Sequence, residues 1–257
     1  MQSSGGIYVS NLDGTESREI ASYDSVGAHV IFPVISHDGE KVAFFAYPNF
    51  IFVTNADGSN RIQLTDEASN ETVPAFSPDG KRIAFHETND RLIVIDSDGT
   101  DRTVISSNAS SYSDGGDHLE WSPDGRRIVF TGFGYSDICI IDADGTHETN
   151  LTNDAGEDGW PSFSPDGSRI MYSGAQGYDI WIMNADGSEK ENLTNTPGEM
   201  EWRSACSPRG DKAVYISLLP QGEGIGTLKV MDLRTKAVKN LFSNVWSEYF
   251  VEIVSAI

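Results

Sequence analysis

The sequence predicts an all-β fold, a six-bladed β-propeller of four-stranded antiparallel blades. A Ser-Pro-Asp-Gly motif recurs with its serines 41 to 45 residues apart, the period of a four-stranded propeller blade. A second motif, ending in Asp-Gly, alternates with the first, and the runs between the motifs are short and rich in Ile, Val and Phe. Each repeat needs a neighbour to bury its apolar faces, so the 257 residues are expected to form one domain, 1–257.

The first motif is predicted to be a turn between two strands. Proline presets φ at the second turn position, and glycine takes the left-handed position. Full copies begin at Ser77, Ser122 and Ser164, a weaker copy with His in place of Pro begins at Ser36, and a degraded copy with Arg in place of Asp begins at Ser207. Each copy is expected to join strand A, which lines the central channel, to strand B.

The second motif is predicted to be the hairpin between strands C and D. Its leading Asn or Asp bonds the turn backbone, and its glycine supplies a positive φ. Five copies begin at Ile7, Ile51, Leu92, Ile138 and Ile180, and a last one that lacks the glycine begins at Leu228. Six such hairpins predict six blades.

The ring is predicted to close through a blade that the N- and C-terminal strands share. Leu151 to Ser164 aligns without a gap on Leu241 to Val254, so the C-terminal segment resembles a strand A. The blade repeats are predicted near 30–64, 73–105, 118–151, 160–193 and 202–242, with the shared blade at 7–20 plus 246–254. No strand B is visible for the shared blade, and an unpaired edge there favours self-association.

The composition limits the classes of partner. The net charge of −21 and the pI near 4.4 argue against nucleic acid and anionic membranes. No apolar run approaches the roughly 18 residues of a membrane-spanning helix, and the N-terminus does not resemble a signal peptide. Cys139 and Cys206 lie in apolar strand patterns and are expected to be buried free thiols.

Acidic residues gather in the loops that join strand D to the next strand A. These loops carry twelve carboxylates and no Lys or Arg, although the chain has 18 basic residues. All such loops emerge on one face of a propeller, so this face is expected to attract a protein or peptide with a basic or polar segment. Basic residues such as Arg82 and Arg127 are expected nearer the opposite face. The residues expected to contact the partner are Asp66, Glu67, Asp114, His118, Asp154, Glu157, Trp160, Glu199 and Trp202.

Five further loop carboxylates lie at nearly the same distance before the motif serine. Four of them lie six residues before it, or before the residue aligned with it at the C-terminus, and the fifth lies five residues before it. They are Glu71, Asp117, Asp158, Glu201 and Glu248. A ring of hard oxygen ligands without His or Cys suits Ca²⁺, which would also relieve the repulsion between the carboxylates. The alternative is that water and diffuse counterions neutralise the ring.

Nucleophilic hydrolysis has no signature in the chain, which contains neither a Gly-x-Ser-x-Gly elbow nor a phosphate-binding loop. His118 at the channel mouth is the one candidate ligand or base, and an ordinary structural histidine is the alternative. We therefore expect a non-catalytic binding module. Two alternatives stay open: a metal-dependent lactonase-like or lyase-like propeller enzyme, and an accessory propeller of a larger protein.

The repeated core, such as Ser77-Pro78-Asp79-Gly80 followed by Ile83-Ala84-Phe85, resembles the repeat of the TolB-type propellers, the WD40-like PD40 family. The resemblance covers about residues 7–254. It implies a six-bladed propeller that binds a protein near the channel mouth, takes up calcium there, and acts in the periplasm or at the cell surface. The same repeat occurs in the non-catalytic propellers of prolyl-oligopeptidase-like enzymes.

Overall fold

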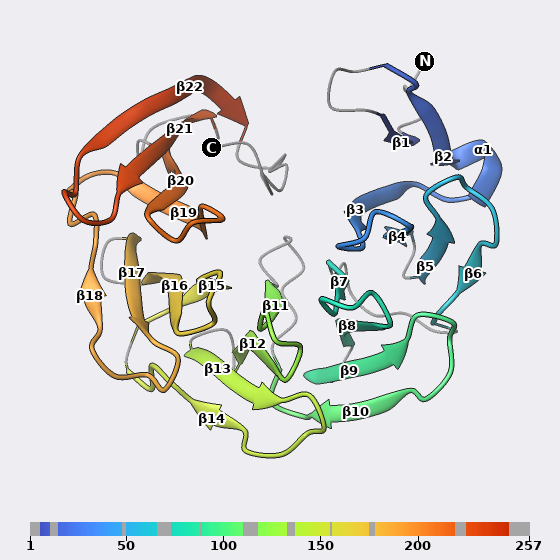
Figure 1. The fold of residues 1–257 in the computed structure, drawn as a ribbon, viewed down its shortest axis with the longest axis horizontal. Coiled ribbons are helices and arrows are strands. Elements are labelled where there is room, and N and C mark those ends of the chain that lie inside the picture. Colours follow the sequence, from blue (N-terminus) through green and yellow to red (C-terminus); the bar gives the residue numbers. More distant parts are fainter. Residues whose placement is uncertain are drawn as a thin grey trace.

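The computed structural model confirms the all-β propeller: in the part of the chain that the structure describes, five four-stranded antiparallel sheets and one two-stranded sheet are arranged around a common centre (Figure 1). The structure describes residues 6–10, 15–47, 50–65, 73–87, 89–109, 118–132, 137–154, 156–174, 178–218 and 225–246. Within these ranges, no helix has the length and apolar character needed to cross a membrane.

Each four-stranded sheet is one blade, and its strands run outward from the centre in chain order. The innermost A strands are β3 (Val30–Ile35), β7 (Ala75–Phe76), β11 (Leu119–Trp121), β15 (Gly159–Phe163) and β19 (Met200–Cys206). The B strands are β4 (Lys41–Ala46), β8 (Arg82–Glu87), β12 (Arg127–Gly132), β16 (Arg169–Gly174) and β20 (Lys212–Leu218). The C strands are β5 (Phe50–Asn55), β9 (Arg91–Asp96), β13 (Asp137–Asp142), β17 (Asp179–Asn184) and β21 (Ile225–Asp232). The outermost D strands are β6 (Ile62–Gln63), β10 (Thr103–Ser106), β14 (Thr149–Asn150), β18 (Glu191–Asn192) and β22 (Val238–Trp246).

The N-terminal hairpin, β1 (Gly6–Val9) with β2 (Arg18–Ser22), supplies strands C and D of the remaining blade. The short helix α1 (Tyr23–Val26) leads from it to β3. The sequence predicted that Trp246 begins the closing strand A. This prediction is wrong, because Trp246 ends β22 and pairs with Ile225. The long strand β21 offers ladder partners as far as Ile225, so β22 extends through a segment expected to be a loop. The rest of the expected closing strand, 247–254, lies outside the described residues.

The Ser-Pro-Asp-Gly turn is held by its own side chains. In the second blade, Ser77 Oγ donates to Asp79 Oδ1 at 2.7 Å, and the same carboxylate oxygen accepts the Lys81 amide at 3.1 Å. The Arg82 amide donates back to Ser77 Oγ at 3.0 Å. Gly80 has a φ of +68°, which glycine adopts without steric cost. These bonds lower the pKa of the Asp79 carboxyl, chiefly through Ser77.

The same turns carry contacts between neighbouring blades. Arg82 Nη2 donates to the Gly125 carbonyl at 3.1 Å, and its guanidinium lies 4.7 Å from the ring centroid of Trp121. Arg127 repeats the arrangement on the Gly167 carbonyl at 3.4 Å and over the ring of Phe163. These two arginines therefore connect one blade to the next, and they are half-buried rather than part of a free basic face.

Replacing Gly167 with alanine is expected to lower the free energy of unfolding by about 2 kcal/mol. Its φ of +69° disfavours a side chain by about 1 kcal/mol, and a Cβ would lie 3.3 Å from Pro123 of the preceding blade. Gly39 is a matched control, since it has a φ of +75° and no atom within 4 Å of an added Cβ. Urea unfolding of both variants should give a smaller loss for Gly39→Ala. Equal losses would show that the contact with Pro123 contributes nothing.

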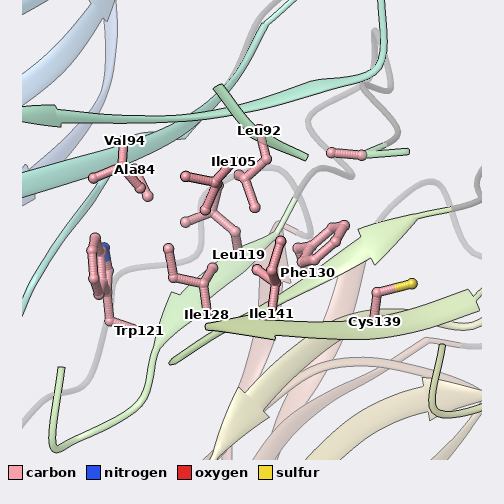
Figure 2. Packing of buried hydrophobic residues seen from close by; sticks show 11 residues of the cluster. Ala84, Leu92, Val94, Ile105, Leu119, Trp121, Ile128, Phe130, Cys139 and Ile141 are labelled. Atoms are coloured by element: carbon pink, nitrogen blue, oxygen red, sulfur yellow. The ribbon is translucent and has the colours of Figure 1, made fainter. Parts of the chain in front are cut away.

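The core lies between the blades. Figure 2 shows Leu92 and Ile105 of one blade facing Ile128, Phe130 and Ile141 of the next. All five side chains are at most 7% exposed. Similar clusters occupy the neighbouring blade interfaces, so each blade depends on its neighbours for burial of its apolar faces.

Candidate functional site at the channel mouth

The carboxylates of the predicted ring do not line the channel where the structure describes them. Asp158 is 5% exposed and Glu201 is fully buried. Val30, at the same register in the first blade, is also buried. Glu71, Asp117 and Glu248 lie outside the described residues, as do Asp66, Glu67 and Asp114 of the expected partner site. In the described ranges, no three His, Cys, Asp or Glu side chains are grouped so that they could hold a metal ion.

Glu201 lies between the fourth and fifth blades. Its Oε1 accepts the Thr196 hydroxyl at 2.6 Å, and its amide donates to the Tyr178 carbonyl at 2.7 Å. Burial raises the pKa of the Glu201 carboxyl, and the negative charge of Asp179 raises it further, against the lowering effect of the threonine hydroxyls. The carboxylate is thus a buried element of the blade interface.

Replacing Glu201 with glutamine is expected to stabilise the protein at pH 7 by about 1 kcal/mol, because a buried charge is removed while the hydrogen-bond acceptor is kept. Below pH 4.5, the ordinary pKa of a glutamate, the Glu201 carboxyl group is protonated in both the folded and the unfolded protein. Because its pKa is raised in the folded protein, the wild type loses stability as the pH rises through that folded-state pKa. The gain should therefore vanish below about pH 4. Urea unfolding at several pH values measures it, and the same gain at pH 3.5 as at pH 7 would contradict the prediction.

Glu199 has a partner that the sequence pattern did not reveal. Its Oε2 accepts from the Lys229 ammonium and from the Ser217 hydroxyl. These bonds, the lysine first, lower the pKa of the Glu199 carboxyl. Lys229 lies on β21, so a basic side chain from a strand neutralises one of the loop carboxylates. Asp154 and Glu157 are exposed on the loop before β15. The rim of the channel, which the loops between strand D and the next strand A form, is therefore still acidic at this loop.

A β-bulge reshapes the innermost strands. Register shifts interrupt β3, β15 and β19, and within them Phe32, Trp160 and Arg203 have φ values of 51°, 51° and 54°. Each lies four residues before the motif serine, as does His118, and all four are half-buried. A left-handed φ at bulky residues is strained, and bulges of this kind re-aim side chains near functional sites.

Aromatic side chains pack together beside these bulges. The rings of Trp160 and Trp202 meet edge to face with centroids 5.1 Å apart, and Tyr178 stacks on Trp202 at 5.4 Å. Both tryptophans are half-buried. Among the described residues, neither indole Nε1 has a hydrogen-bond partner, although both atoms are shielded from solvent. Buried indole N–H groups usually find an acceptor, so these two donors stand out.

His118 extends this group onto a third blade. Its ring bonds to the Pro161 carbonyl, and Nδ1 has no partner in the described part of the chain, so Nε2 makes that bond. Surrounding protein atoms and the positive charge of Arg203 lower the pKa of His118 to about 4. The ring is therefore neutral at pH 7. We call His118, Trp160, Tyr178, Trp202 and Arg203 the channel cluster.

A comparison with protein families gives a match over residues 117–249, about half of the chain, to the TolB beta propeller domain, PD40. The chain belongs to the PD40 family. A search of curated protein sequences finds no match to it.

Solved structures share the fold of this PD40 chain. A putative TolB from Agrobacterium tumefaciens is 23% identical with a TM-score of 0.70, over 92% of this chain and 88% of that one. TolB from Acinetobacter baumannii is 20% identical with a TM-score of 0.67, over 91% of this chain and 59% of that one. An oligogalacturonate lyase in complex with manganese is 17% identical with a TM-score of 0.66, over 94% of this chain and 70% of that one. At these identities the likeness concerns the fold.

The sequence pointed to three members of the channel cluster, His118, Trp160 and Trp202, and missed Tyr178 and Arg203. A signal was available for Arg203. The position four residues before the motif serine reads Phe32, Val73, His118, Trp160 and Arg203. That variety, inside an otherwise repetitive PD40 pattern, is typical of a site rather than of a turn.

Proposed function

We propose that this PD40 propeller is a non-catalytic binding module that holds a protein or peptide at the channel cluster. The observation that carries the proposal is the group of half-buried Trp160, Trp202 and Tyr178 beside the strained bulges. Trp, Tyr and Arg are enriched among the residues that dominate the binding energy of protein interfaces, where a bound partner desolvates them fully. The two TolB structures share the fold on which this cluster is built.

The exposed rim is proposed to guide the partner. Asp154 and Glu157 are exposed on the loop before Trp160, and the net charge of the chain is −21. A partner with basic residues outside the contact segment would be steered toward such a rim, and the association rate would fall with added salt.

Selection from a library of random short peptides tests the proposal. Selected peptides should bind the wild type and lose binding to Trp160→Ala and Trp202→Ala. Tyr8→Ala is a matched control, since Tyr8 is an aromatic residue 58% exposed on β1, in a different blade. Peptides that bind all three variants equally, or no enrichment at all, would reject the proposal.

A second candidate is a metal-dependent enzyme, which the fold shared with the oligogalacturonate lyase favours. Turnover of oligogalacturonate with added Mn²⁺ would place this candidate first. A third proposal, an accessory propeller within a larger protein, is compatible with the binding role.

Calcium binding and a periplasmic or cell-surface location remain predictions. The calcium prediction now depends on Glu71, Asp117 and Glu248, which lie outside the described residues, because Asp158 and Glu201 are buried within the blades. Calorimetric titration of the wild type and of a Glu71→Gln, Glu248→Gln double variant with Ca²⁺ tests it. Unchanged heats in the variant would contradict a site at these residues.

A further inference from the structure

Strand β1 has an unpaired inner edge within the part of the chain that the structure describes. Its ladder partner there is β2, on its outer side, whereas the C strand of each four-stranded blade pairs with a B strand and a D strand. β1 is the inner strand of its sheet and faces the centre of the ring (Figure 1). A groove with a volume of about 300 Å³ lies beside it, lined by β1 and by Pro33, Ile35 and Val42 of the first blade. The main-chain groups of such an edge readily pair with another strand.

The groove exposes a position that neighbouring strands cover elsewhere in the ring. Ile35, directly before the motif serine, is 48% exposed, whereas Trp121 and Phe163 at the same position are each 4% exposed. Arg82, from the B strand of the preceding blade, lies over Trp121, and the Trp121 indole donates to the Ala75 carbonyl of that blade's A strand. The sixth blade, formed by β1 and β2, has neither an A nor a B strand among the described residues, so Ile35 lacks such a cover.

The fifth blade forms the other wall of this space. Five of the apolar clusters each join residues of two adjacent blades, but the cluster that contains Val214, Ile216 and Leu228 draws on the fifth blade alone. Its side chains face the position of the sixth blade, since Ala213 and Tyr215, which alternate with them along β20, pack against the fourth blade. We call the space between this face, β1 and the first blade the slot.

The five B strands in place show which sequence fits such a slot. Each begins with Lys or Arg and has an apolar second residue and an aromatic fourth residue, and these last two are at most 3% exposed. The basic residue connects to the following blade, as Arg82 does when it donates to the Gly125 carbonyl at 3.1 Å. The five basic residues are Lys41, Arg82, Arg127, Arg169 and Lys212.

We propose that the slot binds an extended segment of a partner protein that pairs antiparallel with β1 and has the same basic–apolar–x–aromatic pattern. Its second and fourth side chains would contact the fifth blade, and its third would enter the groove beside Ile35. Its basic side chain would lie near Asp38 and Glu40, which are exposed on the turn of the first blade. The 257 residues contain this pattern five times, once in each B strand, so they offer no sixth copy of their own.

The test is a calorimetric titration of the full chain with a peptide of the sequence Ser168 to Gly174, which copies β16. The peptide should bind, and Ile35→Asp should weaken binding about tenfold or more, because it places a charge in the apolar groove. Val104→Asp is the matched control, since Val104 is 42% exposed on β10 of the second blade, and should leave binding unchanged. A peptide with glutamate in place of its arginine should bind about tenfold more weakly. Thermal unfolding confirms that each variant is folded.

N-methylation of the peptide tests the strand pairing. Alternate amides of an antiparallel strand face its partner, so methyl groups on one alternate set should abolish binding and methyl groups on the other set should not. Equal effects of the two sets would overturn the pairing with β1. The inference goes beyond the proposed function, and Trp160→Ala separates the two, because it should weaken binding at the channel cluster and leave the slot unchanged. Trp202 is unsuitable for this purpose, since it packs against the fifth-blade cluster.

The other outcomes assign the slot differently. Absence of binding, or binding that Ile35→Asp leaves unchanged, would overturn the inference and leave the proposed function in place. Sedimentation that shows dimers of the wild type and monomers of Ile35→Asp would assign the slot to a second copy of this chain. A disulfide that forms between Val9→Cys and Val251→Cys in the unbound chain would assign it to the C-terminal residues, and this result would also overturn the inference.

Discussion

Replacing Phe130 with alanine should lower the free energy of unfolding by about 4 kcal/mol. Phe130 lies on β12, is fully buried, and belongs to the cluster between the second and third blades (Figure 2). The substitution removes most of an aromatic side chain and leaves a cavity that close-packed strands cannot collapse to fill. Leu92 and Ile105 would lose their contacts with Phe130, so the substitution weakens the interface between the second and third blades.

Guanidinium unfolding of the wild type and the variant measures this loss. Phe242→Ala is the control, because Phe242 is 65% exposed on β22 and its removal should change stability by about 0.5 kcal/mol or less. A loss below about 1 kcal/mol for Phe130→Ala would mean that the blades are held mainly by other contacts. The arginines that bond the next turn, Arg82 and Arg127, would be the first to examine.

The period of the turns and the type of the strands could be predicted because each depends on local chemistry. The Ser77 and Asp79 side chains and the Gly80 backbone hold their own turn, and the Ser–Asp bond recurs in the copies at Ser36, Ser122 and Ser164. In the last copy Arg209 replaces the aspartate, and Ser207 Oγ donates to Asp211 instead. Strands between such turns must bury both faces in a propeller, which their apolar runs already indicate. The sequence therefore predicted correctly that each motif serine lies in the turn between strand A and strand B of a blade.

The direction of the channel-mouth side chains could not be predicted, because it depends on the bulge. An extra residue in strand A reverses which side chains face the blade interior. Counting back from the serine placed Asp158 and Glu201 in the channel, whereas the bulge buries them and leaves Trp160 and Arg203 half-exposed. Phe, Trp and Arg at the bulge carry no turn signal, so the positive φ is invisible in the sequence.

Contacts between the loops and neighbouring strands could not be predicted from the sequence either. Lys229 reaches Glu199 from a strand about 30 residues later, and Tyr178 meets Trp202 of the next blade. Pairing of strands within the fifth blade brings Lys229 to Glu199, and packing between the fourth and fifth blades brings Tyr178 to Trp202. The acidic rim predicted from composition is consequently smaller than the loop sequences indicate.

A buried aspartate connects the core of the fourth blade to the candidate site. Asp179 is 6% exposed at the start of β17 and accepts Asn192 Nδ2 at 2.7 Å and the Thr196 amide at 3.1 Å. Asp137 has the same role one blade earlier, accepting Asn150 Nδ2 at 2.7 Å. The repeated Asn-Leu-Thr segments are therefore explained by these bonds, which occupy the asparagine amides.

Replacing Asp179 with alanine should lower the free energy of unfolding by about 3 kcal/mol, because buried donors on Asn192 and Thr196 lose a charged acceptor. Asp137→Ala should cost less, since no amide equivalent to that of Thr196 bonds Asp137 among the described residues. Urea unfolding compares the two. Equal losses would mean that the Thr196 bond is unimportant.

The same substitution should reach the channel cluster. Asp179 follows Tyr178, whose carbonyl accepts the Glu201 amide at 2.7 Å, so losing the aspartate loosens the backbone that positions Tyr178 and Trp202. Peptide binding should weaken in Asp179→Ala and hold in Asp137→Ala. Because Asp179 also raises the pKa of Glu201, the stability gained by Glu201→Gln should shrink in the Asp179→Ala background. A double-mutant cycle measures that coupling, and strictly additive effects would show that the two carboxyl groups do not interact.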